Sequence, residues 1–149
     1  MLNEDYKDIL RSLSRNKVKF LVVGAYALGM HGYPRATGDF DIWVEASKEN
    51  SVRIFNALRD FGAPLKQIAD STFSKKGIVF QIGIPPRRID IINHIDGVSF
   101  SKAYPRKKMV NLEGIRIPFI SLKDLIKNKQ STGRMKDKVD VAYLKEKKK

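Results

Sequence analysis

Short apolar runs alternate along the chain with stretches whose apolar residues recur at helical spacing. Residues 18–23 form a nearly all-apolar run between lysines and a glycine, which predicts a short buried strand. Residues 39–44 alternate between polar and apolar side chains, which predicts a second strand whose even-numbered residues share an apolar face. Two further strand-like runs, 78–84 and 88–95, are joined by a segment rich in glycine and proline.

Helices are expected before and between these strands. Asn3 can cap a first helix over residues 5–14, whose early turns carry acids that favour the positive end of a helix dipole. A tight turn at Gly24 leads into a short second helix. Residues 49–61 have helical spacing and are followed by Gly62, a typical helix stop. The side chains of this helix expected to face the core are Val52, Phe55, Ala57 and Leu58.

The C-terminal third predicts a hairpin followed by two helices. Residues 109–119 contain two short strand-like runs around a Glu-Gly turn. Ser121 and Asp124 have the spacing of a capping box, which predicts a helix that reaches about residue 129. A Thr-Gly break precedes a last helix over residues 134–144.

Length and element order together predict one domain over residues 1–149. A chain of 149 residues with 42% hydrophobic and 30% charged side chains can bury a core of its own. The sequence contains no repeat, linker or low-complexity segment. The order helix, strand, helix, strand, helix, strands, helices predicts an α/β or α+β domain, a small mixed sheet flanked by helices with a C-terminal helix pair.

The charge of the chain is strongly uneven. Residues 1–100 hold 14 basic and 11 acidic side chains, whereas residues 101–149 hold 15 basic and 5 acidic ones, within a formal net charge of +13. Such a basic region favours a polyanion such as RNA or DNA as a partner. The alternative interpretation is a solvated helix pair with a lysine-rich end that aids solubility.

Several classes of protein are excluded or disfavoured. The chain has no cysteine, which excludes a disulfide scaffold, a cysteine nucleophile and a cysteine zinc site. The longest mostly apolar stretch, 20–30, is far below the ~18 residues of a membrane span. Acidic residues follow Met1 where a signal peptide would carry basic ones. We therefore expect a soluble, cytoplasmic protein without a membrane partner.

The candidate chemistry lies in carboxylates. No GxGxxG or GxxxxGK[ST] nucleotide loop is present. Asp39 and Asp41 are separated by one residue in a predicted strand, so their side chains leave the same face of the sheet. Two like charges so close are unfavourable without a cation, and Mg²⁺ (or Mn²⁺) prefers carboxylate oxygens.

Asp90 is a third carboxylate within an apolar strand-like run. Three such acids on one sheet face are what a phosphoryl- or nucleotidyl-transfer site with divalent metals requires. The alternative is that Asp39 begins its strand as a turn residue and that Asp90 pairs with Arg87 or Arg88. Either alternative is reasonable for one residue, but the metal site accounts for all three acids.

These residues resemble a known superfamily. Gly24-Ala25, followed after thirteen residues by Asp39-Phe40-Asp41-Ile42, resembles the signature of the nucleotidyltransferases related to DNA polymerase beta. Asp90 falls where that superfamily places its third carboxylate. Residues 35–42 resemble the bacterial minimal nucleotidyltransferases and the AbiEii toxin group, and residues 127–140 resemble the C-terminal helical motif of those groups. The resemblance implies a nucleotidyltransferase fold over most of the chain.

The resemblance also implies the roles of individual residues. It places Asp39, Asp41 and Asp90 as catalytic metal ligands. The triphosphate of an NTP would lie over the turn at Gly24 and Ala25, where most active members have Gly-Gly or Gly-Ser, so backbone amides must serve here. The further residues expected to contact the nucleotide are Arg35, Thr37, Lys129 and Arg134.

Lys129 can also be considered without the resemblance. It continues the apolar stripe of its helix, so its ammonium must either extend to solvent or meet an anion. We expect a phosphate contact, with a solvent-directed lysine as the alternative. Asp137 and Asp140 lie among basic residues and are expected to form pairs within the last helix rather than bind a ligand.

The expected function is Mg²⁺-dependent transfer of a nucleoside monophosphate from an NTP. The basic C-terminal region makes RNA, such as tRNA, the first candidate acceptor. A cognate toxin or antitoxin protein is the second, because some minimal nucleotidyltransferases modify a partner toxin. The alternative is a nucleotide- or RNA-binding module of a toxin–antitoxin pair that kept the fold without turnover.

Overall fold

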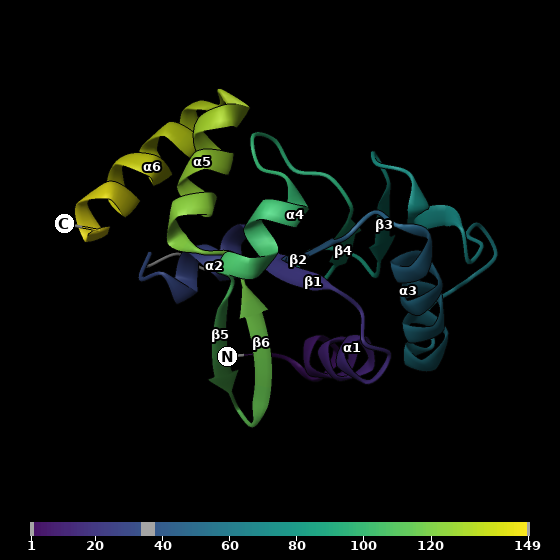
Figure 1. Cartoon of the computed structure of the whole chain (residues 1–149). Coiled ribbons are helices and arrows are strands. Elements are labelled where there is room, and N and C mark those ends of the chain that lie inside the picture. The colour runs from purple at the N-terminus through teal and green to yellow at the C-terminus, as the bar shows by residue number, and fades with distance from the viewer. Residues whose placement is uncertain (1, 34–37, 149) are drawn as a thin grey trace.

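The computed structural model describes residues 2–33 and 38–148 and shows a six-stranded mixed sheet with helices on both faces (Figure 1). The strand order is β3-β4-β2-β1-β6-β5. The strands are β1 (Phe20–Val23), β2 (Phe40–Val44), β3 (Val79–Ile82), β4 (Ile89–Ile92), β5 (Lys108–Leu112) and β6 (Ile115–Phe119). The α-helices are α1 (Glu4–Arg15), α2 (Gly24–Met30), α3 (Lys48–Phe61), α4 (Phe100–Ala103), α5 (Leu122–Thr132) and α6 (Met135–Lys148).

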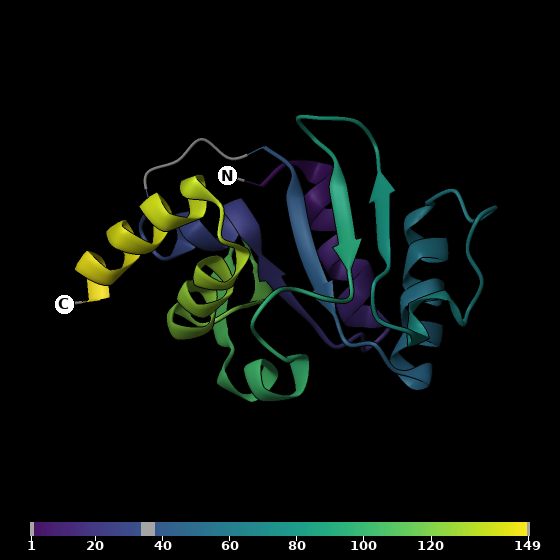
Figure 2. The ribbon, with the colours of Figure 1, turned by 90° about the horizontal axis from the view of Figure 1, so that it is seen from above.

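The helices divide between the two sides of the sheet. Helices α1 and α3 pack against each other on one side, and α4, α5 and α6 lie over the other, as Figures 1 and 2 both show. The Ser12 hydroxyl donates a 2.6 Å hydrogen bond to the carbonyl of Ala57, which ties α1 to α3. Among the described residues, no helix is long and apolar enough to cross a membrane.

The helix boundaries follow from local side chains. The side chains of Asn3, Ser47 and Ser121 accept hydrogen bonds from backbone N–H groups in the first turns of α1, α3 and α5. Gly62 and Gly133 end α3 and α5 in the left-handed region, with φ of 93° and 72°. The predicted helix breaks and the predicted N-cap at Ser121 are therefore present.

The sheet register brings distant acids together. Strand β2 pairs with β4 in parallel, and Asp41 lies directly opposite Asp90. Strand β1 runs antiparallel to β2 and ends at Val23, which is the register partner of Asp41, so the turn at Gly24 begins beside this acid. Partner residues on adjacent strands share a face of the sheet. The pairing of β1, β2 and β4 therefore places one turn and two carboxylates at a common point.

One expectation about the core is wrong. Val52 is exposed and Phe55 is only half-buried, whereas Ile54 lies in the core with Ala57 and Leu58. The buried stripe of α3 includes two polar residues, Asn50 and Ser51. Their side chains form hydrogen bonds with backbone groups of four residues beside α3, which are Lys19, Glu45, Asp70 and Phe73. Because these bonds satisfy the polar side chains, α3 can turn them inward and leave Val52 outside.

Candidate active site

A cavity of about 380 Å³ lies where β1, β2 and β4 meet the junction of α5 and α6. It brings together every predicted site residue that the structure describes. Those residues are Gly24, Ala25, Asp39, Asp41, Asp90, Lys129 and Arg134. The other two predicted residues, Arg35 and Thr37, lie outside the described residues. We call Asp39, Asp41 and Asp90 the carboxylate site.

Gly24 is in close contact with the carboxylate site. Its φ is +68°, a conformation that side chains disfavour, and a Cβ at this position would collide with the carboxylate of Asp41. The turn after β1 can therefore approach the acid only because residue 24 is glycine. Ala25 follows in the first turn of α2 and also lines the cavity.

Arg88 is a component of this site that the sequence suggested only as an alternative partner of Asp90. Its Nε and Nη2 donate to the two carboxylate oxygens of Asp90 at 2.7 and 3.1 Å. The same Nη2 lies 3.3 Å from Oδ2 of Asp39, and the Arg88 backbone N–H donates to Oδ1 of Asp39 at 3.1 Å. Asp90 thus lines the cavity and is also the ion-pair partner of Arg88.

The negative charge of Asp41 is disfavoured in the carboxylate site. No described residue donates a hydrogen bond to its carboxylate, while Asp90 and Asp39 lie close by. Burial first, and then the charges of Asp90 and Asp39, raise the pKa of Asp41 to about 6, although Arg88 and Lys129 oppose this rise. One guanidinium does not compensate three carboxylates, so the site favours an additional cation.

Lys129 has a different environment from the expected phosphate contact. It is buried, and its Nζ lies 3.0 Å from Oδ1 of Asp137 and 3.3 Å from Oδ2 of Asp140. Arg134 Nε also donates to Asp137, at 2.7 Å. We call these four side chains the α5–α6 ion network. The anions that Lys129 meets in the structure are two aspartates of the chain itself.

The expectation that Asp137 and Asp140 pair within the last helix is met only in part, because both also pair with Lys129 of α5. Arg134 does pair with Asp137, but both aspartates are 1% exposed and their shared partner is on α5. Burial alone would raise the pKa of Asp137, yet hydrogen bonds from Thr132, Lys129 and Arg134 outweigh it and lower the pKa to about 2. Thr132 and Arg134, at the turn between α5 and α6, therefore both bond to Asp137.

Comparison with known proteins identifies the fold. No protein-family model and no curated protein matches the chain. The crystal structure of a proposed nucleotidyltransferase from Thermotoga maritima is similar with a TM-score of 0.62 and 20% sequence identity, over 98% of this chain and 96% of that one. The structure of ANT(2″)-Ia in complex with adenylyl-2″-tobramycin gives a TM-score of 0.53 at 14% identity, over 97% of each chain. The chain has the nucleotidyltransferase fold.

The donor set of this nucleotidyltransferase fold suits a divalent cation. Carboxylate oxygens are the ligands that Mg²⁺ and Mn²⁺ prefer, and three carboxylates line one cavity. As they stand, no three acidic or histidine side chains within residues 2–33 and 38–148 are grouped closely enough to hold one ion. Arg88 is bonded to two of the three acids. A metal would therefore have to compete with this guanidinium for its ligands.

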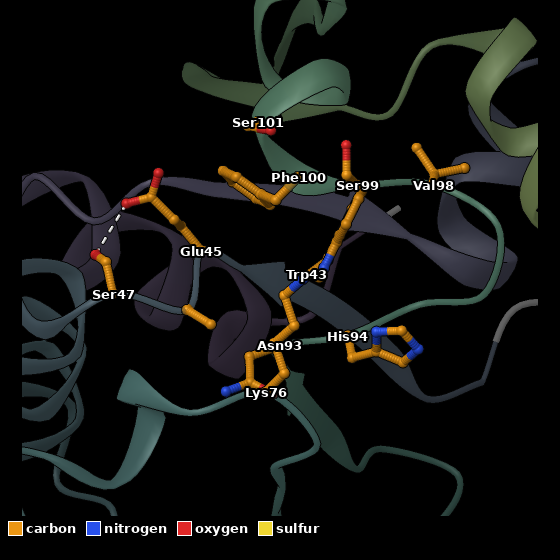
Figure 3. Close-up of a pocket in the computed structure, with 11 residues that line it drawn as sticks. Trp43, Glu45, Ser47, Lys76, Asn93, His94, Val98, Ser99, Phe100 and Ser101 are labelled. Atoms are coloured by element: carbon orange, nitrogen blue, oxygen red, sulfur yellow. Dashed lines mark hydrogen bonds between the residues drawn. The ribbon is translucent and has the colours of Figure 1, made fainter.

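A second hollow, of about 280 Å³, lies at the other end of β2 and β4 in this nucleotidyltransferase fold (Figure 3). Trp43 and Phe100 form part of its wall, with their rings 5.1 Å apart and nearly perpendicular. Asn93 and His94 come from the segment that follows β4. None of the predicted site residues lines this hollow, so it is separate from the carboxylate site. Trp43 itself is 1% exposed and packs in the core.

Proposed function

We propose that the protein is a divalent-metal-dependent nucleotidyltransferase that transfers a nucleoside monophosphate from an NTP to an acceptor hydroxyl. The observation that carries this proposal is the carboxylate site, in which three acids share one cavity with the turn at Gly24 and with basic side chains of α5 and α6. The acids suit the metal, and the bases suit the triphosphate. The structure of ANT(2″)-Ia with an adenylylated aminoglycoside supports adenylyl transfer as one reaction of this fold.

In this proposal, Asp39, Asp41 and Asp90 would hold Mg²⁺ or Mn²⁺. The bound ion would neutralise charge that develops on the transferred phosphoryl group. Asp90 would also take the proton of the acceptor hydroxyl. The acceptor oxygen would then form a bond to the α-phosphorus while the bond from that phosphorus to the bridging oxygen breaks, and pyrophosphate would leave.

The triphosphate would lie over the turn at Gly24 and Ala25. Arg134, 70% of whose side chain is exposed, uses Nε for Asp137 and keeps its terminal nitrogens for phosphate. The expected contribution of Lys129 is revised, because its ammonium already holds two aspartates. It contributes positive potential at the cavity wall and shares Asp137 with Arg134. Arg35 and Thr37 remain proposed phosphate contacts.

RNA is the proposed acceptor class, because α5 and α6, which border the cavity, belong to the basic region of residues 101–149. A protein acceptor is the second proposal. Membership of the AbiEii-like group and a role in a toxin–antitoxin pair belong to this same proposal, since the sequence resemblance alone supports them.

The test of the function is transfer of label from each α-labelled NTP to total cellular RNA with Mg²⁺ or Mn²⁺. We expect labelled RNA and released pyrophosphate with the wild type, and neither with Asp41→Asn. Asp70→Asn, an exposed acid outside the cavity, is the control and should transfer normally. Label on a protein instead of RNA would identify the second acceptor class.

RNA binding should depend strongly on salt. Because basic side chains displace condensed counterions, the logarithm of the association constant should fall linearly with the logarithm of salt concentration, with a slope of about −0.7 for each neutralised phosphate of a single strand. The double variant Lys123→Ala with Lys127→Ala, at two exposed positions on α5, should make that slope less steep. Lys66→Ala with Lys75→Ala, exposed in the N-terminal region, is the matched control. A flat salt response in a binding titration would remove RNA from the proposal.

A module that binds nucleotide without turnover is the second candidate. Ala25 in place of the usual glycine or serine and the ion pairs of Arg88 with Asp39 and Asp90 favour it. The two candidates differ in one measurement. A silent module would bind an NTP with metal but release no pyrophosphate with any acceptor.

A further inference from the structure

Arg88 holds the atoms that a metal would need. Its guanidinium makes a bidentate ion pair with both oxygens of Asp90, at 2.7 and 3.1 Å, and reaches Oδ2 of Asp39 at 3.3 Å. Bidentate, charge-assisted pairs of this kind are among the strong hydrogen bonds of proteins. Metal binding at the carboxylate site therefore requires these bonds to be exchanged.

The guanidinium is also free to move once a metal binds Asp39 and Asp90. The Arg88 side chain is 26% exposed and lines the cavity, and within the described part of the chain its guanidinium pairs with Asp39 and Asp90 alone. The backbone of Arg88 is fixed separately, since its N–H donates to Asp39 and its carbonyl accepts from Phe40 N–H at 2.8 Å. The side chain can therefore turn while the strand stays in place.

Two other cations at the cavity wall already have aspartate partners, whereas the third, Lys136, is exposed. Lys129 is held by Asp137 and Asp140, and Arg134 is anchored to Asp137 through Nε. A metal ion on the carboxylate site would leave Arg88 as a cation without a counter-ion inside the same cavity. The phosphates of a nucleotide would supply that counter-ion, and a guanidinium binds phosphate in a bidentate manner.

We propose that Arg88 acts as an internal cation that a divalent metal displaces from Asp90 and Asp39, after which its guanidinium binds the phosphates of the NTP. This inference rests on the proposed function. Metal and nucleotide then assist each other, because the metal frees the arginine that the nucleotide uses. The ligand-free site is correspondingly protected from binding metal alone.

The first test is the affinity of the ligand-free protein for Mn²⁺ alone, measured by calorimetry. Arg88→Met removes the competing cation and is expected to tighten Mn²⁺ binding about tenfold or more, the loss of one strong charged hydrogen bond. Arg87→Met changes the net charge equally at an exposed neighbour outside the cavity and should leave the affinity near that of the wild type. Equal affinities in the two variants would overturn the proposal.

The second test follows the guanidinium itself. The Nε–H signal of Arg88, assigned in an NMR spectrum by its loss in Arg88→Met, should shift when Mg²⁺ is added and shift again with a non-hydrolysable ATP analogue. With saturating Mn²⁺, the same analogue should bind Arg88→Met about tenfold more weakly than Arg87→Met. Unchanged nucleotide affinity would overturn the transfer of Arg88 to phosphate.

A conservative variant separates folding from function. If Arg88→Met does not fold, Arg88→Lys retains the charge but cannot form the bidentate pair, and it should bind Mn²⁺ more tightly than the wild type by a smaller factor. Wild-type affinity in Arg88→Lys would overturn the proposal. If neither the wild type nor any variant binds Mn²⁺, the metal site of the proposed function is itself wrong. Binding by all of them with equal affinity would contradict only the role of Arg88.

Discussion

Replacing Lys129 with methionine is expected to destabilise the protein by about 3–5 kcal/mol, the usual cost of removing one partner from a buried ion pair. Methionine retains the apolar stem of the lysine, but it leaves Asp137 and Asp140 buried with one shared cation fewer. Arg134 can still reach Asp137, but its ion pair does not extend to Asp140. The thermal midpoint of unfolding of Lys129→Met should also fall by many degrees.

Lys127→Met is the matched control for this prediction. Lys127 lies two residues away on the same helix and is exposed, so its replacement should change the free energy of unfolding little. Chemical denaturation of both variants measures the difference. If Lys129→Met were as stable as Lys127→Met, the α5–α6 ion network would contribute nothing to the docking of α6. A lysine whose ammonium extended to solvent would give that result.

The α5–α6 ion network also predicts acid sensitivity. The pKa of Asp137 is about 2 in the folded protein and 3.8 in the unfolded chain. The ionised form of Asp137 is therefore favoured more strongly in the folded state than in the unfolded chain. Its stabilising contribution is present above about pH 4 and is lost as the pH falls toward 2. Asp137→Asn should therefore flatten the acid limb of stability against pH, which a series of denaturation curves measures.

Asp41→Asn is expected to abolish metal-dependent NTP binding and, at the same time, to stabilise the ligand-free protein. The pKa of Asp41 is about 6 in the fold against 3.8 in the unfolded chain. Such a difference means that the ionised carboxylate lowers the free energy of unfolding by about 3 kcal/mol above pH 6. The asparagine amide carries no charge and can donate to Asp39 or Asp90, so up to that amount should be recovered.

The pH dependence distinguishes this mechanism from a general effect. With a raised pKa, the stability due to the proton on Asp41 is fully present below pH 3.8 and is lost as the pH rises through 6. Asp41→Asn should therefore exceed the wild type in stability at pH 7.5 and differ little from it near pH 3.5. Asp70→Asn, at an exposed site, should show no such trend. If the gain in stability over the wild type were no larger at pH 7.5 than at pH 3.5, neither burial nor the neighbouring acids would disfavour the ionised form of Asp41.

Local sequence patterns were sufficient for most of the elements and for the acids, although they did not predict α4. Helix caps such as Asn3 and Ser121 act within one turn, and a glycine such as Gly62 acts at its own position, so neighbouring residues contain the information. The alternation around Asp39 and Asp41 likewise records which side chains leave one face of a strand. The resemblance to nucleotidyltransferases added the fold, which the structural comparison confirms.

The pairing of charges depended on tertiary structure. Lys129 meets Asp137 and Asp140 only because α6 folds back against α5, and Asp90 lies opposite Asp41 only because β4 pairs with β2 in parallel. In α3, the hydrogen bonds of Asn50 to the segments before it decide which face is buried. By itself, the sequence determined which groups carry charge and, to within a few residues, where most helices and strands lie. The tertiary structure decided which of those charges neutralise one another, because that depends on distances between segments far apart in the chain.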